Sequence, residues 1–110
     1  MIYKDKPAEF SPAEITDFES KNPSREKVEV FRYESKRSKD RPATFYVAKP
    51  NRLQIEAIEE TRERSRGNGN DLMINTGVLA GDVDQLDEDD ALYFGLLRDV
   101  TNLIEAKKKL

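Results

Sequence analysis

One stretch decides the fold: Thr44-Phe45-Tyr46-Val47-Ala48-Lys49-Pro50-Asn51-Arg52-Leu53. It opens with aromatic and β-branched residues, which are typical of a strand, and a helical pattern begins directly after Lys49-Pro50. Proline has no N–H to donate and a φ close to the helical value, so it suits the first turn of a helix. The stretch therefore predicts a strand over 43–48, a very short connection, and a helix over 51–65.

The residues before this stretch predict a hairpin and one further helix. Residues 26–34 alternate as a strand does, with Val28 and Val30 on one face and Phe31 and Tyr33 on the other. The polar residues 35–42 would connect this strand to 43–48 as an antiparallel hairpin with a long basic tip. Upstream, residues 1–10 predict an extended lead-in, and Ser11-Pro12-Ala13-Glu14 is a capping box that starts a helix over 11–21.

The residues after this stretch predict helices. Gly67-Asn68-Gly69-Asn70 indicates a turn between helices and lacks the spacing of a phosphate-binding loop. A helix is expected to follow, with Val78 and Leu79 among its interior residues and Gly81 as its stop. A last helix is expected from Asp87 onward, and its apolar stripe comprises Leu92, Leu96, Val100, Leu103 and Ile104.

These elements predict one α+β domain over 1–110. It would consist of a helix and a small antiparallel β-hairpin over 11–48, followed by a mainly helical part over 49–110, with about four helices in total. The length of 110 residues favours a single domain. Charged residues make up 37% of the chain and apolar residues 36%, which indicates a thin core under large solvated surfaces.

The composition also limits the chemistry. Cysteine and histidine are absent, which removes disulfides, thiolate metal sites and the commonest general base. No nucleophile stands at a diagnostic spacing from a base, so we expect no catalytic residue, no metal site and no cofactor. No apolar run approaches the length of a membrane span, and we expect a cytoplasmic protein.

Charge is distributed unevenly, and two clusters each leave two interpretations open. Residues 25–66 carry twelve basic and eight acidic side chains, whereas residues 67–110 carry four and nine. The first cluster could contact nucleic acid phosphates or be a solvated hairpin tip, which the acidic pI near 5.1 favours; it consists of Lys36, Arg37, Lys39 and Arg41. The acidic residues over 82–90 could bind a hard cation, or form a solvated loop that also caps the last helix.

The order of the elements and two motifs carry a resemblance to a known family. The motifs are the strand-to-helix step over 45–52 and the segment Leu72-Met73-Ile74-Asn75-Thr76-Gly77-Val78-Leu79-Ala80-Gly81-Asp82. An acidic turn and a long helix ending in Lys107, Lys108 and Lys109 follow. Over residues 26–110 the chain resembles the small tail assembly chaperones of long-tailed phages and prophages.

The resemblance implies a non-enzymatic protein of the bacterial host cytoplasm. Its members coat the long, aggregation-prone tape measure protein and help to recruit tail tube subunits. We therefore expect a groove between the helix over 72–79 and the last helix, with a partner or a second copy of the chain contacting Leu72, Val78, Phe94, Leu97 and Val100. Two alternatives stay open: a nucleic-acid-associated phage or bacterial regulator that uses the basic hairpin tip, and an enzyme subunit or accessory domain.

Overall fold

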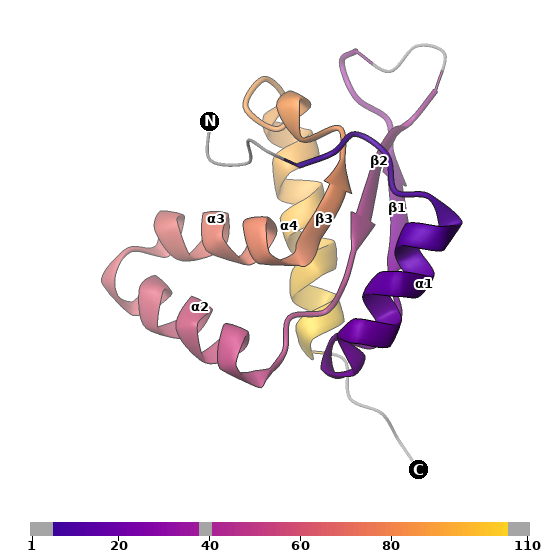
Figure 1. Cartoon of the computed structure of the whole chain (residues 1–110). Coiled ribbons are helices and arrows are strands. Elements are labelled where there is room, and N and C mark those ends of the chain that lie inside the picture. Colours follow the sequence, from indigo (N-terminus) through magenta and orange to yellow (C-terminus); the bar gives the residue numbers. More distant parts are fainter. Residues whose placement is uncertain (1–5, 38–40, 106–110) are drawn as a thin grey trace.

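A three-stranded antiparallel sheet in the order β1–β2–β3 lies at the centre of the domain (Figure 1). The computed structural model describes residues 6–37 and 41–105. The chain runs through α1 (Pro12–Lys21), the short 3-10 helix η1 (Pro23–Arg25), β1 (Glu29–Tyr33), β2 (Ala43–Val47), α2 (Arg52–Arg64), α3 (Arg66–Gly77), β3 (Val78–Gly81), the 3-10 helix η2 (Val83–Gln85) and α4 (Asp90–Glu105). The expected α+β class, the hairpin and the four α-helices are confirmed.

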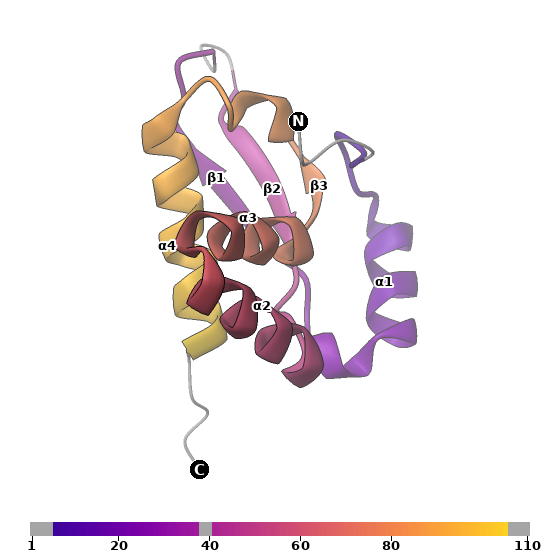
Figure 2. The same ribbon diagram turned by 90° about the vertical axis from the view of Figure 1, so that its left-hand side faces the viewer.

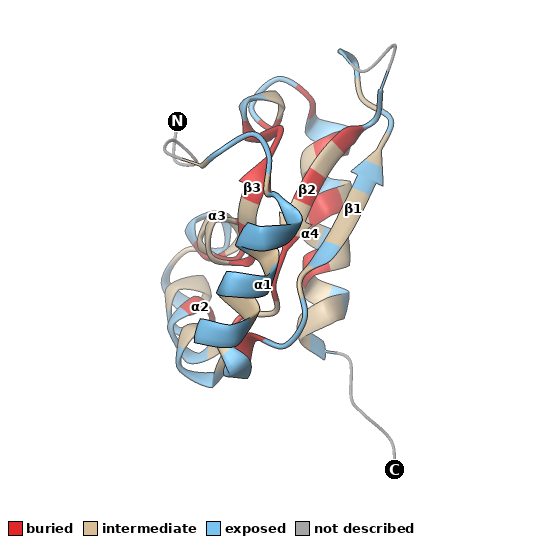
Figure 3. Ribbon diagram, turned by 45° about the vertical axis from the view of Figure 1, so that its right-hand side comes forward, coloured by how far each residue is buried: buried red, intermediate tan, exposed pale blue. Residues whose placement is uncertain are grey.

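Helices cover both faces of the sheet. Helix α4 lies on one face and α1 on the other, while α2 and α3 pack together at one end (Figure 2). Alternate residues of β2 explain this arrangement, because Ala43, Phe45 and Val47 are fully buried in the core with Leu96 and Val100 of α4. The opposite face of the sheet is covered more sparsely: the Phe10 ring packs against Phe18 and Tyr46, and α1 contains no buried residue (Figure 3).

The hairpin has the predicted strand faces. Phe31 pairs with Phe45 and Tyr33 with Ala43, so Phe31 and Tyr33 lie on the face that packs against α4. The Tyr33 hydroxyl donates a hydrogen bond of 2.6 Å to Asp99 on α4, which ties the first strand to the last helix. Burial and this hydrogen bond raise the pKa of Tyr33 well above its ordinary value.

Capping residues define the starts of α1 and α2. The capping box of Ser11 and Glu14 is confirmed, and Asn51 and Gln54 form a second one at the start of α2. Because Asn51 is the N-cap, the buried Pro50 stands one residue before the cap and not in the first helical turn. The short step from β2 to α2 is otherwise as the sequence predicts.

Three expectations for the second half are wrong. Helix α3 begins at Arg66, so Gly67-Asn68-Gly69-Asn70 lies inside the helix and forms no turn. Val78 and Leu79 belong to β3, which pairs antiparallel with β2, and not to a helix. Helix α4 begins at Asp90 and not at Asp87, because the Asp89 carboxylate accepts the Leu92 N–H and the Asp89 carbonyl accepts the Tyr93 N–H.

The free edge of β3 meets the N-terminal segment. The Gly81 N–H donates to the Pro7 carbonyl at 2.9 Å, and the Lys6 Nζ donates to the Asn75 carbonyl at 2.7 Å. Residues 6–10 therefore run beside the sheet, whereas residues 1–5 of the expected lead-in and the expected lysines 107–109 lie outside the described residues. In the described part of the chain, the helices are too short or too polar to cross a membrane.

Candidate protein-docking surface

Helix α4 presents apolar side chains on two sides. Leu92, Leu96 and Val100 are buried against the sheet, which is the stripe that the sequence predicts. Phe94 points away from this core and is 61% exposed. Leu97, one turn further along, is half-buried. A helix with an apolar outer side next to its core side has surface left for a partner.

Phe94 and Leu97 line a groove between α4 and the helices α2 and α3. The groove has a volume of about 260 Å³, and its other lining residues are Arg62, Arg66, Asn70, Arg98, Thr101 and Asn102. We call it the α3–α4 groove. It arises because the consecutive helices α2 and α3 pack together and α3 packs on α4, which comes later in the chain.

Neighbouring side chains hold the apolar wall of the groove in place. The Phe94 ring packs edge-on against Tyr93, with the ring centroids 5.2 Å apart. Tyr93 in turn donates its hydroxyl to Asp71 of α3 at 2.7 Å. The Thr101 hydroxyl donates to the Leu97 carbonyl at 2.7 Å and lies 3.3 Å from the Met73 sulfur. Phe94 is thus exposed on a helix that is fixed on its other side.

The five residues expected to contact a partner separate in the structure. Phe94 and Leu97 lie together in the α3–α4 groove. Leu72 is half-buried and lines a different shallow depression with Asn68, Asp71 and Asn75. Val78 and Val100 are fully buried in the core, so neither can contact a partner without the protein opening. For Val100, the periodic pattern did not distinguish the inner side of the helix from its outer side. Val78 lies in β3 and not in the expected helix.

The basic hairpin tip and the acidic segment after β3 lie against each other. Arg41 forms a bidentate pair with Asp82 at 2.9 and 3.1 Å, and Arg37 pairs with Asp84 and Glu88. The Lys36 N–H donates to the Asp89 carboxylate at 3.0 Å. We call these charged residues the tip cluster; they are Lys36, Arg37, Arg41, Asp82, Asp84, Glu88 and Asp89. Much of the opposite charge of the two chain segments is therefore neutralised within the molecule.

Hydrogen bonds set the pKa values of two carboxylates in the tip cluster. Burial acts to raise the pKa of Asp82, but hydrogen bonds from Arg41 and the Thr44 N–H outweigh it and hold that pKa below its usual value. The N–H groups of Lys36 and Leu92 lower the pKa of Asp89 in the same way. Both carboxylates are thus bound to protein donors.

These contacts bear on the two interpretations of the charged clusters. Arg37 and Arg41 have protein partners, so the tip cluster offers no observation in favour of phosphate binding, which stays a prediction; Lys39 lies outside the described residues. Within residues 6–37 and 41–105, no three acidic side chains converge in an arrangement that could hold a metal ion. The carboxylates of Asp82 and Asp89 instead accept hydrogen bonds from the hairpin.

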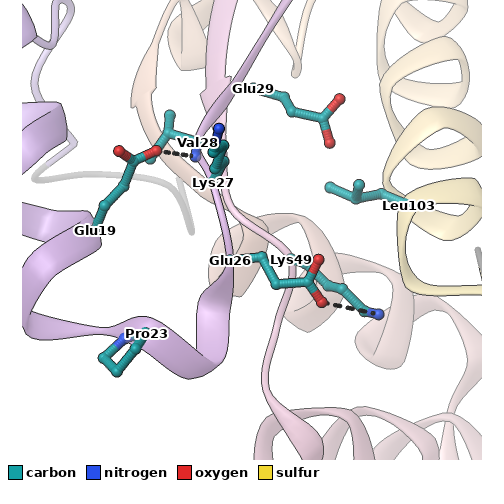
Figure 4. Close-up of a pocket in the computed structure, with 8 residues that line it drawn as sticks. All are labelled: Glu19, Pro23, Glu26, Lys27, Val28, Glu29, Lys49 and Leu103. Atoms are coloured by element: carbon teal, nitrogen blue, oxygen red, sulfur yellow. Dashed lines mark hydrogen bonds and ion pairs between the residues drawn. The ribbon is translucent and has the colours of Figure 1, made fainter. Parts of the chain in front are cut away.

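A larger pocket, of about 790 Å³, opens between η1, the start of β1 and the end of α4 (Figure 4). Three of its charged side chains hold the chain: Glu19 accepts the Val28 N–H at 2.7 Å, and Glu26 pairs with Lys49 at 3.5 Å. Leu103 of α4 closes one side. The pocket brings together no serine, threonine or tyrosine that a base could activate.

Arg25 is a buried residue that the sequence did not single out. Its guanidinium donates to the carbonyls of Ala48, Lys49 and Thr76 at 2.7–3.1 Å and lies 5.5 Å from the centre of the Phe18 ring. Burial lowers the pKa of Arg25 from its ordinary value. A single arginine between Pro23 and Lys27 gives no signal of this role in the sequence, because its partners come from two distant segments.

Comparison of this chain with models of protein families, with curated proteins and with solved structures found no match.

Proposed function

We propose that this protein is a non-enzymatic tail assembly chaperone of a phage or prophage, acting in the cytoplasm of the bacterial host. It would cover apolar segments of the tape measure protein and bring this protein together with tail tube subunits. Two things support the proposal: the resemblance of residues 26–110 to that family, and an exposed apolar surface on α4. The second of these carries the structural argument.

The exposure of Phe94 beside Leu97 is the observation that carries the proposal. Single exposed apolar residues are ordinary, and Leu53 on α2 is one, at 75% exposed. Phe94 differs because it stands at the wall of a groove that also contains the half-buried Leu97. An aromatic side chain in such a place is typical of a residue that anchors a protein partner.

The same surface suggests how such a chaperone would work. A long helical protein with apolar stripes aggregates unless those stripes are covered. The α3–α4 groove could receive side chains from one stripe, while the strongly charged remainder of the surface keeps the complex in solution. The groove is small, so each contact would be modest and readily released as tube subunits assemble.

Co-expression tests the proposal directly. A fragment of the tape measure protein, encoded by the long gene expected nearby, would be produced with and without this chain, and its soluble fraction measured. We expect the wild-type chain to raise that fraction severalfold. Phe94→Asp is expected to abolish the gain while far-UV circular dichroism stays unchanged, because Phe94 is exposed. Leu97→Asp is expected to act in the same direction.

The matched control is Leu53→Asp, which places the same charge on another exposed large apolar residue. It should leave the fragment as soluble as the wild-type chain does. A Phe94→Asp chain that protects the fragment as well as wild type would overturn the proposal. Loss of helicity in Leu97→Asp would instead assign Leu97 to the core and leave Phe94 as the test.

A further inference from the structure

Arginines surround the α3–α4 groove. Arg62 comes from α2, Arg66 from α3 and Arg98 from α4, and no carboxylate is among the eight residues that line the groove. The remaining polar residues that line it are the neutral Asn70, Thr101 and Asn102. The wall formed by Phe94 and Leu97 is therefore bordered by positive charge, although the chain as a whole has a net charge of −3.

Two of the three guanidinium groups remain available to a partner. Arg66 has no ion-pair partner among residues 6–37 and 41–105, and it is the first residue of α3, where the helix dipole does not favour a cation. Arg98 is 70% exposed and meets only its neighbour Asp99, at 3.4 Å. Asp99 itself is shared, since its other oxygen accepts the Tyr33 hydroxyl. Arg66 and Arg98 differ in this respect from Arg37 and Arg41 of the tip cluster, which pair with carboxylates from a distant segment.

Arg62 is held more firmly by its neighbours than Arg66 and Arg98 are. Its side chain is 28% exposed, pairs with Glu59 at 3.4 Å, and packs through its stem against Gly69. It contributes positive charge to the groove but is less able to reorient toward a partner. On α4, the acidic residues Asp90 and Glu105 lie one turn beyond the lining residues at either end, so the positive charge is confined to the middle of the surface.

The size of the groove indicates what enters it. Its volume of about 260 Å³ lies below the range of about 300–1,000 Å³ typical of small-molecule sites. It is large enough for one or two apolar side chains that project from another protein. Phe94, Leu97 and Thr101 follow one another at helical spacing along α4, and this spacing matches the side-chain repeat of a second helix lying beside it.

We propose that the α3–α4 groove binds an amphipathic helix whose apolar side chains are flanked by aspartate or glutamate. The inference rests on the proposed function, because it specifies which segments of a partner this site would take. The apolar side chains would pack on Phe94 and Leu97, and the flanking carboxylates would pair with Arg66 and Arg98. Guanidinium and carboxylate groups form bidentate pairs, and complementary charge selects the partner and speeds association. A helix with basic flanks is rejected.

Two synthetic peptides test this proposal. Both are amphipathic helices with leucine at the same positions, and they carry glutamate or lysine at the flanking positions. Each is titrated to millimolar concentration into the ¹⁵N-labelled full chain. The glutamate peptide is expected to shift the amide signals of residues 66–70 and 94–102, and to bind about tenfold more tightly than the lysine peptide. Raising the salt from about 50 to about 500 mM should weaken its binding.

Variants of exposed residues provide the controls. The double substitution Arg66→Glu and Arg98→Glu should reverse the preference between the peptides, whereas Arg66→Lys with Arg98→Lys should keep its direction. Arg52→Glu changes an exposed arginine of α2 outside the groove and should have no effect. Equal binding of the two peptides, or an unchanged preference in the double glutamate variant, would overturn the proposal.

The peptide test of this inference and the co-expression test of the proposed function can succeed or fail independently. If the tape measure fragment is kept soluble through Phe94 but the two peptides bind alike, this inference fails and the proposed function stands. If the glutamate peptide is preferred but the fragment is not protected, the proposed function fails and this inference stands. If analytical ultracentrifugation shows a dimer that Phe94→Ser abolishes, a second copy occupies the groove and the inference is overturned.

Discussion

Gly69 of α3 lies against the backbone of Arg62 in α2. A Cβ atom built on Gly69 would stand 2.7 Å from the Arg62 Cα and 1.9 Å from its Cγ, which no real contact allows. Helices α2 and α3 are connected through Ser65 alone, so they must fold back on each other over a very short distance. The absent side chain at position 69 is what lets the two backbones approach.

We predict that Gly69→Ala lowers the free energy of unfolding by about 1–3 kcal/mol, because α2 and α3 must separate to admit the methyl group. Gly67 is the matched control, since it lies in the same helix and a Cβ there would meet nothing within 4 Å. Gly67→Ala should raise the free energy of unfolding by about 0.5 kcal/mol through a better helix propensity. Urea denaturation followed by circular dichroism measures both. A Gly69→Ala protein as stable as wild type would contradict the close approach.

The same contact explains why Gly67-Asn68-Gly69-Asn70 is helical although its sequence indicates a turn. Glycine and asparagine are poor helix formers, so a local interpretation ends the helix there. Tertiary packing reverses this preference at Gly69, and Ser65 supplies the N-cap by accepting the Asn68 N–H. The sequence predicts a helix where strand β3 lies for a related reason. Val78–Gly81 is a short apolar run, which periodicity alone cannot assign to a strand or a helix.

The features that could be predicted are those with a local cause. The capping box at Ser11, the alternation within the hairpin strands and the long stripe of α4 each depend on neighbours in the sequence. The candidate site could be predicted only in part. Phe94 and Leu97 were among the residues expected to contact a partner, but the same set included the buried Val78 and Val100. The arginines of the groove come from three helices, and only the packing of those helices brings them together.

Protonation of the tip cluster should destabilise the protein in acid. Hydrogen bonds in the native state hold the pKa values of Asp82 and Asp89 below the value of 3.8 that an isolated aspartate has. The stabilisation they contribute is therefore present above that value and is lost as the pH falls through the lower native-state pKa values. The ion pair of Asp82 with Arg41 weakens over the same range.

Asp82→Asn is expected to lower the free energy of unfolding at pH 7 by about 1–3 kcal/mol, since it removes the charge that pairs with Arg41 and replaces one of the two oxygens that accept from Arg41 and the Thr44 N–H with an NH2 donor. The difference from wild type should shrink as the pH falls below about 4. Thermal melts between about pH 2 and 7 measure this. Asp87→Asn, an exposed position in the same segment, is the control. A difference that stays constant across this range would show that Asp82 acts through packing and not through its charge.

Arg25 connects three backbone carbonyls that no other described side chain reaches. The carbonyls of Ala48 and Lys49 follow β2, and that of Thr76 lies in the last turn of α3, where a cation is favoured by the helix dipole. The residue thereby connects η1 to both the sheet and α3. Its burial costs desolvation, so the contacts must more than offset that cost for Arg25 to stabilise the fold.

We predict that Arg25→Met lowers the free energy of unfolding by about 3 kcal/mol, because it leaves buried carbonyls without donors. Arg25→Lys should lose less, since an ammonium group can still donate but cannot span all three acceptors. Lys21→Met is the control: its partner Asp17 is one turn away, both side chains are largely exposed, and the change should stay within about 0.5 kcal/mol. Chemical denaturation measures all three variants. If Arg25→Met is as stable as wild type, the desolvation of the guanidinium cancels its hydrogen bonds, and neighbouring contacts such as the Glu26–Lys49 ion pair are enough to hold η1.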